Sequence, residues 1–333
     1  MKRLRTVSPA SRGWTRRRAG RGFVYLDADG ARVPDAQVER IRALAIPPAW
    51  SDVWICPVPN GHIQAVGSDA AGRRQYLYHP DWRLKRDAAK FDRVLGAATR
   101  LPAARKRVLR DLALEGMPRG RAAAAAVRLL DLGYFRIGND AYTEDNGSFG
   151  LTTLERQHVR RKGDLIVFCF VGKSGIEHCI QIDDTAAIEA LDRMRKRKSA
   201  SRRLLAYQDT RRWADLDAAT VNAYLGEVLG GEMTAKDFRT WHATVLAAVA
   251  LRASDEPGDT KASRKRAVKA AVEEVASYLG NTPTIAKNSY IDPRVLDSYD
   301  SGTTIDVDPG RFRSPERRQA AIEKAVLALL SPS

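Results

Sequence analysis

Cysteine is scarce in this chain. The 333 residues contain three cysteines, Cys56, Cys169 and Cys179, and none of them forms a CxxC pair. Structural zinc sites and disulfide-stapled domains depend on more numerous or more closely spaced cysteines. The sequence therefore predicts neither a disulfide framework nor a zinc site, and it favours a reducing compartment.

Histidine and long apolar runs are scarce as well. The five histidines include no HExxH motif and no tight cluster with aspartate, so no metal site is expected. No apolar run approaches the roughly 18 residues of a transmembrane helix. No signal-peptide core follows the first residues. A membrane protein is therefore not expected.

Positive charge, in contrast, is abundant. Lys and Arg total 56 against 40 Asp and Glu, which gives a net charge of +16. Such a surplus favours a polyanionic partner, because each phosphate that is neutralised releases counterions; charge that serves solubility alone is the simpler alternative. Residues 1–22 are basic and contain no acid. An organelle transit peptide has this composition, but a flexible phosphate-binding arm accounts better for the total charge.

The first part of the chain has the pattern of a small antiparallel sheet. Between Gly22 and about Pro80, short β-rich runs alternate with Asp29-Gly30 and Asn60-Gly61, and such dipeptides are typical of hairpin turns. One short helix is expected near Asp35–Ala45.

Helical periodicity dominates from about Trp82 onward. Asp217 is expected to cap a helix, Gly280 to end one and Ser314-Pro315 to begin the last. The run from Leu165 to Ile182 interrupts this pattern with two β-rich segments around a Gly-Lys-Ser-Gly turn. The predicted fold is therefore α+β: a small N-terminal antiparallel β domain (1–90), then a larger, mostly helical domain (91–333) that contains a β-hairpin.

Four segments carry residues suited to phosphate chemistry: Arg136-Ile137-Gly138 with Tyr142 behind it, Lys173 at the hairpin tip, Lys236 to Trp241 with Arg239 at its centre, and Asn281 with Tyr290 nine residues later. Each has an ordinary explanation by itself. A lysine in a glycine-rich turn is usually solvated, an arginine beside an apolar helix face can snorkel, and a buried tyrosine can simply fill a core. Only the ordered set is informative.

That set resembles the catalytic domain of type IB DNA topoisomerases of the compact bacterial and poxvirus kind. The matching segments are RIGND, NGSFGLTTL, VGKSG, TAKDFRTW and NTPTIAKNSYIDP, and the N-terminal part is similar through IPPAW, GHIQAVG and GRRQYLYHPDW. The resemblance runs in order from Phe23 to about Pro293. It implies that the catalytic residues are Arg136, Lys173, Arg239, Asn281 and Tyr290.

The same resemblance implies the DNA contacts. Tyr142 and Lys236 are similar to positions that contact DNA, and Gln75 and Tyr76 to positions that contact base edges in the major groove. Glycine at 138 would let backbone amides approach a phosphate. Asn281 departs from the family pattern, which has histidine there. An amide can donate a hydrogen bond to a phosphate oxygen but carries no charge, so we expect weaker stabilisation of the transition state.

The implied activity is relaxation of double-stranded DNA through a transient 3′-phosphotyrosyl bond, with Tyr290 as the nucleophile and Lys173 as the general acid. Arg136 and Arg239 would neutralise the phosphate, so neither a metal nor another cofactor is expected. The Gly172-Lys173-Ser174 sequence is not a nucleotide-binding P-loop, because Val167 stands where that motif needs glycine. We expect a monomer that clamps DNA, in the cytoplasm on the nucleoid.

Two other classes of protein fit parts of the pattern. A tyrosine recombinase shares the Arg–Lys–Arg–Tyr set, but recombinases typically have histidine three residues before the second arginine, where this chain has Lys236, and their N-terminal domain is helical. A basic architectural DNA-binding protein would need only the charge of +16. A covalent adduct with DNA would distinguish the enzyme from the architectural protein.

Overall fold

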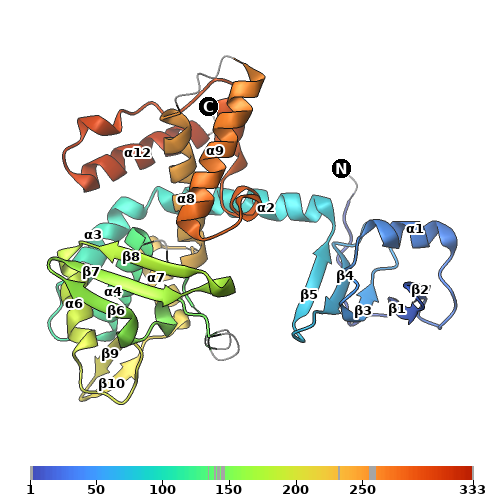
Figure 1. Cartoon of the computed structure of the whole chain (residues 1–333), viewed down its shortest axis with the longest axis horizontal. Helices are drawn as coiled ribbons and strands as arrows, with labels where there is room; N and C mark the ends of the chain where they lie inside the picture. The colour runs from blue at the N-terminus through green and yellow to red at the C-terminus, as the bar shows by residue number, and fades with distance from the viewer. Residues whose placement is uncertain are drawn as a thin grey trace. The chain divides into compact units, whose positions relative to one another are not determined.

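The computed structural model describes residues 3–133, 135–138, 140, 143, 147–231, 233–254 and 260–331. The chain divides into two compact units, residues 1–90 and 91–333, which are described separately (Figure 1). An antiparallel sheet in the first unit and mostly helices in the second confirm the predicted α+β class.

The first unit is built on a five-stranded antiparallel sheet. Its strand order is β2-β1-β3-β4-β5, and helix α1 (Asp35–Ala43) follows the second strand. Ile41 of α1 and Ile55 of the sheet are among the residues of a small apolar core. The strands are β1 (Trp14–Ala19), β2 (Gly22–Leu26), β3 (Ser51–Ile55), β4 (Ile63–Ser68) and β5 (Arg74–Tyr78).

The expectation that residues 1–22 form a flexible basic arm is wrong for residues 14–19. These residues are strand β1, which pairs with β2 and β3. Arg16 donates to the backbone oxygens of Pro47 at 2.6 Å and Trp50 at 2.8 Å. The Arg16 side chain therefore serves the fold by tying β1 to the segment between α1 and β3.

The second unit is mostly helical. Helix α4 is at its centre, and the run Ala122–Ala126 is buried, which lets α3, α6, α7 and α8 contact it closely. As predicted, Asp217 caps α7, Gly280 ends α9 in a left-handed conformation, and Ser314 caps α12. The helices are α2 (Pro80–Ala98, which begins in the first unit), α3 (Leu101–Leu112), α4 (Arg119–Gly133), α6 (Thr185–Arg195), α7 (Ala218–Leu229), α8 (Ala235–Arg252), α9 (Lys261–Leu279), α10 (Pro283–Ser289), α11 (Pro293–Asp300) and α12 (Pro315–Leu330).

The predicted hairpin is present as β7 (Leu165–Val171) and β8 (Glu177–Ile182). Two features were not predicted. Strand β6 (Val159–Lys162) adds a third strand beside β7, and β9 (Ala206–Asp209) with β10 (Arg212–Asp215) forms a separate two-stranded sheet. In Figure 1 the three-stranded sheet lies beside α4 and α6, and α4 contacts β8.

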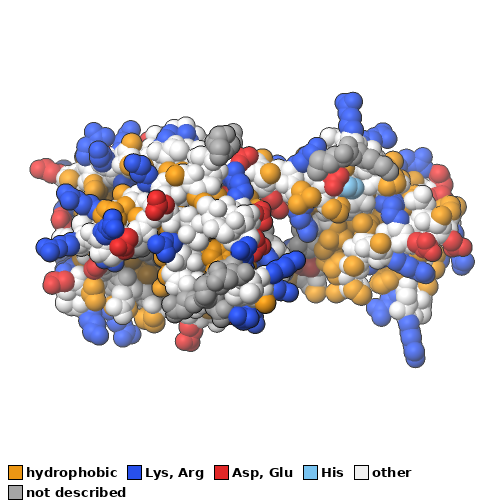
Figure 2. All heavy atoms as spheres, turned by 90° about the horizontal axis from the view of Figure 1, so that it is seen from above, with side chains coloured by type: hydrophobic (Ala, Val, Ile, Leu, Met, Phe, Trp, Pro, Cys, Tyr) orange, Lys and Arg blue, Asp and Glu red, His pale blue; other side chains and the backbone are white. Residues whose placement is uncertain are grey.

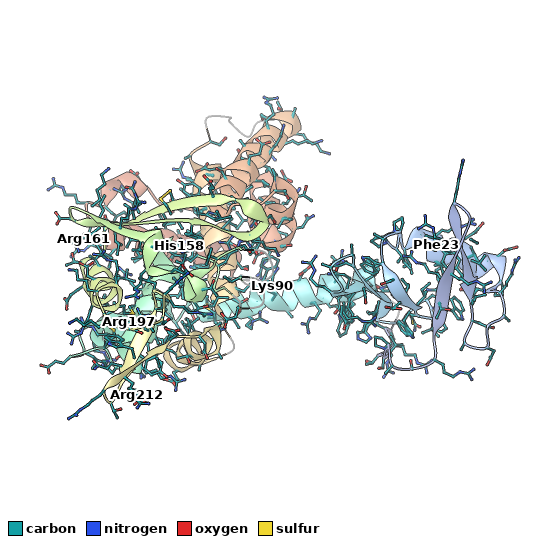
Figure 3. The ribbon with its side chains drawn as sticks, turned by 60° about the horizontal axis from the view of Figure 1, so that its bottom comes forward. Phe23, Lys90, His158, Arg161, Arg197 and Arg212 are labelled. Carbon is teal, nitrogen blue, oxygen red and sulfur yellow. A yellow bond between two sulfur atoms is a disulfide. The ribbon has the colours of Figure 1, made fainter. Side chains whose placement is uncertain are left out.

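The sequence predicted no disulfide framework, but the structure contains one disulfide bond. Cys169 and Cys179 are joined by a disulfide, drawn as the yellow bond in Figure 3. The two residues face each other directly in the β7–β8 register, with Cα atoms 4.3 Å apart. Cysteine spacing did not predict this bond, because only strand pairing brings residues ten positions apart into contact.

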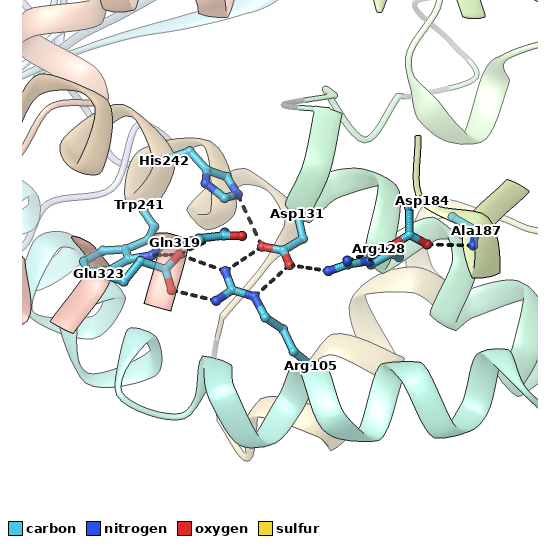
Figure 4. A network of polar contacts seen from close by, with 9 residues as sticks. All are labelled: Arg105, Arg128, Asp131, Asp184, Ala187, Trp241, His242, Gln319 and Glu323. Carbon is cyan, nitrogen blue, oxygen red and sulfur yellow. Dashed lines mark hydrogen bonds and ion pairs between the residues drawn. The ribbon is translucent and has the colours of Figure 1, made fainter. Parts of the chain in front are cut away.

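A buried ionic network joins several helices of the second unit (Figure 4). Asp131 at the end of α4 accepts two hydrogen bonds from Arg105 of α3, both 2.8 Å long. Arg105 also binds Glu323 of α12 at 2.6 Å, and His242 of α8 lies 3.6 Å from Asp131. Burial raises the pKa of the Asp131 carboxyl, but Arg105 outweighs it and the net pKa is lowered. The network therefore connects α4, which precedes Arg136, with α8, which carries Arg239.

Substitution of Asp131 by alanine is expected to lower the free energy of unfolding by about 3–5 kcal/mol, because it leaves the largely buried Arg105 with one partner fewer. Chemical denaturation of the two proteins would measure the difference. Glu273→Ala is the matched control, since its pair with Lys269 is exposed and such pairs contribute about 0–1 kcal/mol. Equal effects of the two substitutions would contradict a stabilising role for the network.

No helix within the described ranges is long and apolar enough to cross a membrane. Among the same residues, no cluster of three or more metal-binding side chains occurs. On the face in Figure 2, Lys and Arg side chains are spread over both units with Asp and Glu between them. The surplus of positive charge therefore does not by itself locate a site.

Candidate active site

Arg136 lies in the segment that follows α4, and backbone hydrogen bonds fix this segment. Leu151 N–H donates to the Arg136 carbonyl at 2.7 Å, and Thr152 N–H to that of Ile137 at 2.8 Å. Gly138 has φ +94°, and a Cβ there would lie 3.1 Å from the Gly150 backbone. Only glycine combines that φ with so close an approach.

Arg239 is held on the buried face of α8. Asp237 begins this helix by accepting from the backbone N–H of Thr234 at 2.9 Å, in the manner of a capping box. The Arg239 side chain is only 4% exposed, and its Nη2 donates to the Leu279 carbonyl at 2.7 Å. The guanidinium is therefore fixed at the end of α9.

Asn281 follows the glycine that ends α9. Its backbone N–H donates to the Ala276 carbonyl at 2.9 Å, and its Oδ1 accepts from Arg136 Nη2 at 2.6 Å. Arg136 Nε and Asn281 Nδ2 are buried donors without a hydrogen-bond partner among the described residues. Buried donors are rarely left unsatisfied, and these two belong to side chains that are hydrogen-bonded to each other.

Tyr290 is the residue that ends α10. Its backbone N–H donates to the Ala286 carbonyl at 3.1 Å, and its carbonyl accepts from the Thr244 hydroxyl of α8 at 3.4 Å. The ring lies 5.5 Å from the Arg239 guanidinium, and the charge of that guanidinium acts on the phenol. Tyr290 is 8% exposed, so its position is set by packing.

The electrostatics of this cluster favour the phenolate. Burial raises the pKa of the Tyr290 phenol, but the charges of Arg239 and Arg136 outweigh it and the net pKa lies below 10.0. Burial, and then Arg136, lower the pKa of Arg239 to about 10. Arg239 therefore remains charged at neutral pH.

These side chains line one cavity of about 380 Å³. Lys173 reaches it from the short 3₁₀ turn at the hairpin tip (Lys173–Gly175), and Lys236 from the first turn of α8. Asn281 joins the group through Arg136. The lining residues are Arg136, Ile137, Gly138, Ser148, Phe149, Gly150, Lys173, Lys236, Arg239 and Tyr290.

The remaining predicted contacts lie elsewhere. Gln75 and Tyr76 are on β5 of the first unit. Gln75 donates to Asp69 at 2.9 Å. Tyr76 is 43% exposed and stacks with Tyr78 at 6.0 Å. Tyr142 lies outside the described residues.

Sequence reasoning missed two residues beside this cluster. Thr244 bonds the backbone of Tyr290 and of Asp292, and no motif marked it. His178 faces inward on β8, and its pKa is lowered by burial and by Arg136 and Arg239. The alternation of β8, in which His178, Ile180 and Ile182 are its less exposed residues, could have indicated that inward position.

Comparison with known proteins identifies the class. Residues 79–303 match the family described as eukaryotic DNA topoisomerase I, catalytic core. Residues 22–69 match the N-terminal domain of bacterial DNA topoisomerase IB. The chain therefore belongs to the type IB DNA topoisomerase family, a family of isomerases whose substrate is DNA. The N-terminal match associates it with the bacterial members.

Several viral topoisomerases are similar to this chain. DNA topoisomerase 1B of Acanthamoeba polyphaga mimivirus is 29% identical over 86% of this chain and 87% of its own length. DNA topoisomerase I of monkeypox virus and DNA topoisomerase 1B of vaccinia virus (strain Copenhagen) are each 23% identical over 73% of this chain and 74% of their own.

Substitution of Asn281 by alanine is expected to slow DNA cleavage by about 10- to 10²-fold, since it removes one donor and an anchor of Arg136. Asn281→Asp should slow it further, because a carboxylate repels the phosphate. Single-turnover cleavage would measure both rates. An unchanged rate in Asn281→Ala would remove this residue from the site.

Proposed function

We propose that this chain relaxes supercoiled DNA by cleaving one strand through Tyr290 and then religating it. One observation carries the proposal: a buried phenol in contact with the Arg239 guanidinium lines the same cavity as Arg136, Lys173 and Lys236. The four cations come from three separate parts of the chain: the segment after α4, the hairpin tip and α8. Folding brings them together, so they are not a local run of charge.

In the cleavage step the Tyr290 oxygen attacks the DNA phosphorus. The bond between phosphorus and the 5′-oxygen breaks, and a 3′-phosphotyrosyl ester forms. The phenol gives its proton to solvent water, which the lowered pKa favours. Religation is the reverse displacement by the 5′-hydroxyl, and a phenolate is a better leaving group than an alkoxide.

Arg136 and Arg239 would neutralise the non-bridging oxygens of the phosphate in the transition state. Planar guanidinium groups donate in a fixed fork, and both are anchored before DNA arrives. The Asn281 amide would add a hydrogen bond without charge from Nδ2, and Arg136 Nε would add a further charged donor.

Lys173 is proposed as the general acid that protonates the departing 5′-oxygen. It lies at the tip of the β7–β8 hairpin. The backbone N–H of Phe149 donates to the Val171 carbonyl of this hairpin at 2.8 Å. Lys173 lines the cavity together with the two arginines, and a lysine ammonium gives up its proton more readily than a guanidinium does.

The exchange of one phosphoester for another conserves the bond energy, so religation needs no ATP. The arginine clamp supplies the charge neutralisation for which many phosphoryl-transfer enzymes use a metal. We therefore propose that the reaction requires neither ATP nor a metal ion. Lys236 lines the cavity at the position where a tyrosine recombinase has histidine, which supports relaxation over recombination.

DNA binding is proposed to involve Gly138, Lys236 and Tyr142 in the catalytic domain (91–333). Gln75 and Tyr76 would contribute from the DNA-clamp domain (1–90). The proposed active form is a monomer that closes around the duplex, in the cytoplasm on the nucleoid. Exposed Tyr76, in a stacked pair with Tyr78, supports a base contact.

Relaxation of a supercoiled plasmid in EDTA without ATP tests the proposal. We expect complete relaxation of positive and negative supercoils, and a covalent protein–DNA adduct at a 3′ end after denaturation. Because phosphate contacts are electrostatic, binding should weaken steeply with salt. A strict magnesium requirement, or binding without any adduct, would contradict the mechanism.

A further inference from the structure

The imidazole of His178 lies between two glycines from separate parts of the second unit. A Cβ placed on Gly172 would lie 2.6 Å from His178 Cδ2 and 2.8 Å from Nε2. A Cβ placed on Gly280 would lie 2.6 Å from Cε1 and 3.2 Å from Nε2. Real Cβ atoms do not come so close, so the ring edge occupies the space that both glycines leave.

Each glycine immediately precedes a residue of the proposed mechanism. Gly172 comes before Lys173 at the hairpin tip, and Gly280 comes before Asn281, which binds Arg136. One side chain therefore sets the spacing between the turn that carries the proposed acid and the turn that carries the amide. The ring contacts both turns.

The face of the imidazole ring is packed as well as its edge. Its face stacks on Phe170 of β7, with ring centroids 5.3 Å apart. A small cavity beside it is lined by Arg136 and Arg239 as well as Phe135 and Phe149. Burial, then Arg136 and then Arg239 lower the pKa of His178, so the ring is a neutral spacer beside two cations.

We infer that His178 is a positioning residue that seats the Lys173 hairpin against the Gly280–Asn281 turn. This inference rests on the proposed function, because it assigns His178 an effect on the general acid. Removal of the ring leaves a gap under Gly172, and the hairpin tip is then free to shift. A displacement of about 1 Å at a reacting group can slow a reaction by about 10²-fold.

A DNA substrate with a sulfur leaving group tests this role. The cleavage site is first mapped on an unmodified duplex, and the bridging 5′-oxygen at that site is then replaced by sulfur. A thiol has a pKa of about 8.5, so its thiolate departs without a general acid. We expect His178→Ala to slow cleavage of the ordinary duplex by about 10²-fold and that of the sulfur duplex by less than about threefold.

The matched variants separate this role from a general defect. Lys173→Ala should show the same rescue by sulfur, whereas Arg239→Ala should be slow on both duplexes. Gln181→Ala, an exposed residue of the same strand, should match the unmodified chain on both. Thermal melting of each variant checks that it is folded.

Gly172→Ala probes the same contact from the other side. The Gly172 backbone (φ −94°, ψ −168°) accommodates alanine, so the added methyl acts through its clash with the His178 ring. We expect Gly172→Ala to slow cleavage, and the double variant with His178→Ala to be no slower than His178→Ala alone.

The outcomes are distinct. If Lys173→Ala is rescued by sulfur and His178→Ala is equally slow on both duplexes, the inference fails while the proposed function stands. A normal rate for His178→Ala on the ordinary duplex also overturns it. If sulfur does not rescue Lys173→Ala, the assignment of Lys173 as the acid is wrong, and the role of His178 fails with it.

Discussion

Tyr290→Phe is expected to abolish plasmid relaxation and covalent adduct formation, while DNA affinity stays within about threefold. The substitution removes one oxygen, and that oxygen is the proposed nucleophile. The ring stays packed beside Arg239, because it is 8% exposed and sits over the guanidinium at 5.5 Å. Binding depends on the phosphate contacts of other residues, so it should survive.

Three measurements on one preparation test this prediction: relaxation, adduct formation after denaturation, and DNA binding at fixed salt. Tyr299→Phe is the control, since Tyr299 is 7% exposed and belongs to the next helix, α11. It should keep its relaxation activity. Residual adduct in Tyr290→Phe would show that another residue is the nucleophile, and equal loss of binding and relaxation would indicate misfolding.

Arg239→Ala is expected to slow cleavage by about 10³-fold, because it removes a charged donor from the phosphate in a buried site. The loss has a second source. The charge of Arg239 lowers the pKa of Tyr290 more than that of Arg136 does, so its removal should raise that pKa. The pH at which cleavage reaches half its maximum should therefore move upward.

Arg239→Lys should lie between Arg239→Ala and the unmodified chain, since it keeps a charge but loses the planar fork. Arg252→Ala, an exposed residue at the end of the same helix, is the matched control and should cleave at nearly the normal rate. Single-turnover rates between pH 6 and about 10 would test both effects. An Arg239→Ala rate within about tenfold of normal, with an unchanged pH profile, would remove Arg239 from the proposed clamp.

Features that depend on neighbouring residues could be predicted without the structure. Asp217 and Gly280 marked helix ends because a cap uses atoms within one turn. Turn dipeptides and alternating apolar residues indicated the N-terminal sheet and the later hairpin for the same reason. The order and spacing of the motifs were enough to indicate the family, which the comparisons then confirmed.

Which distant residues meet could not be predicted from local patterns and became visible in the folded chain. Folding brought Arg136, Lys173, Arg239 and Tyr290 to one cavity, placed β1 in the sheet and joined Cys169 to Cys179. Strand β6 lacks a β pattern of its own and is a strand because β7 pairs with it. Strand pairing and side-chain packing act between atoms that are close in space, whatever their separation in the chain, and no local pattern records them. The seat of His178 between Gly172 and Gly280 arises in the same way.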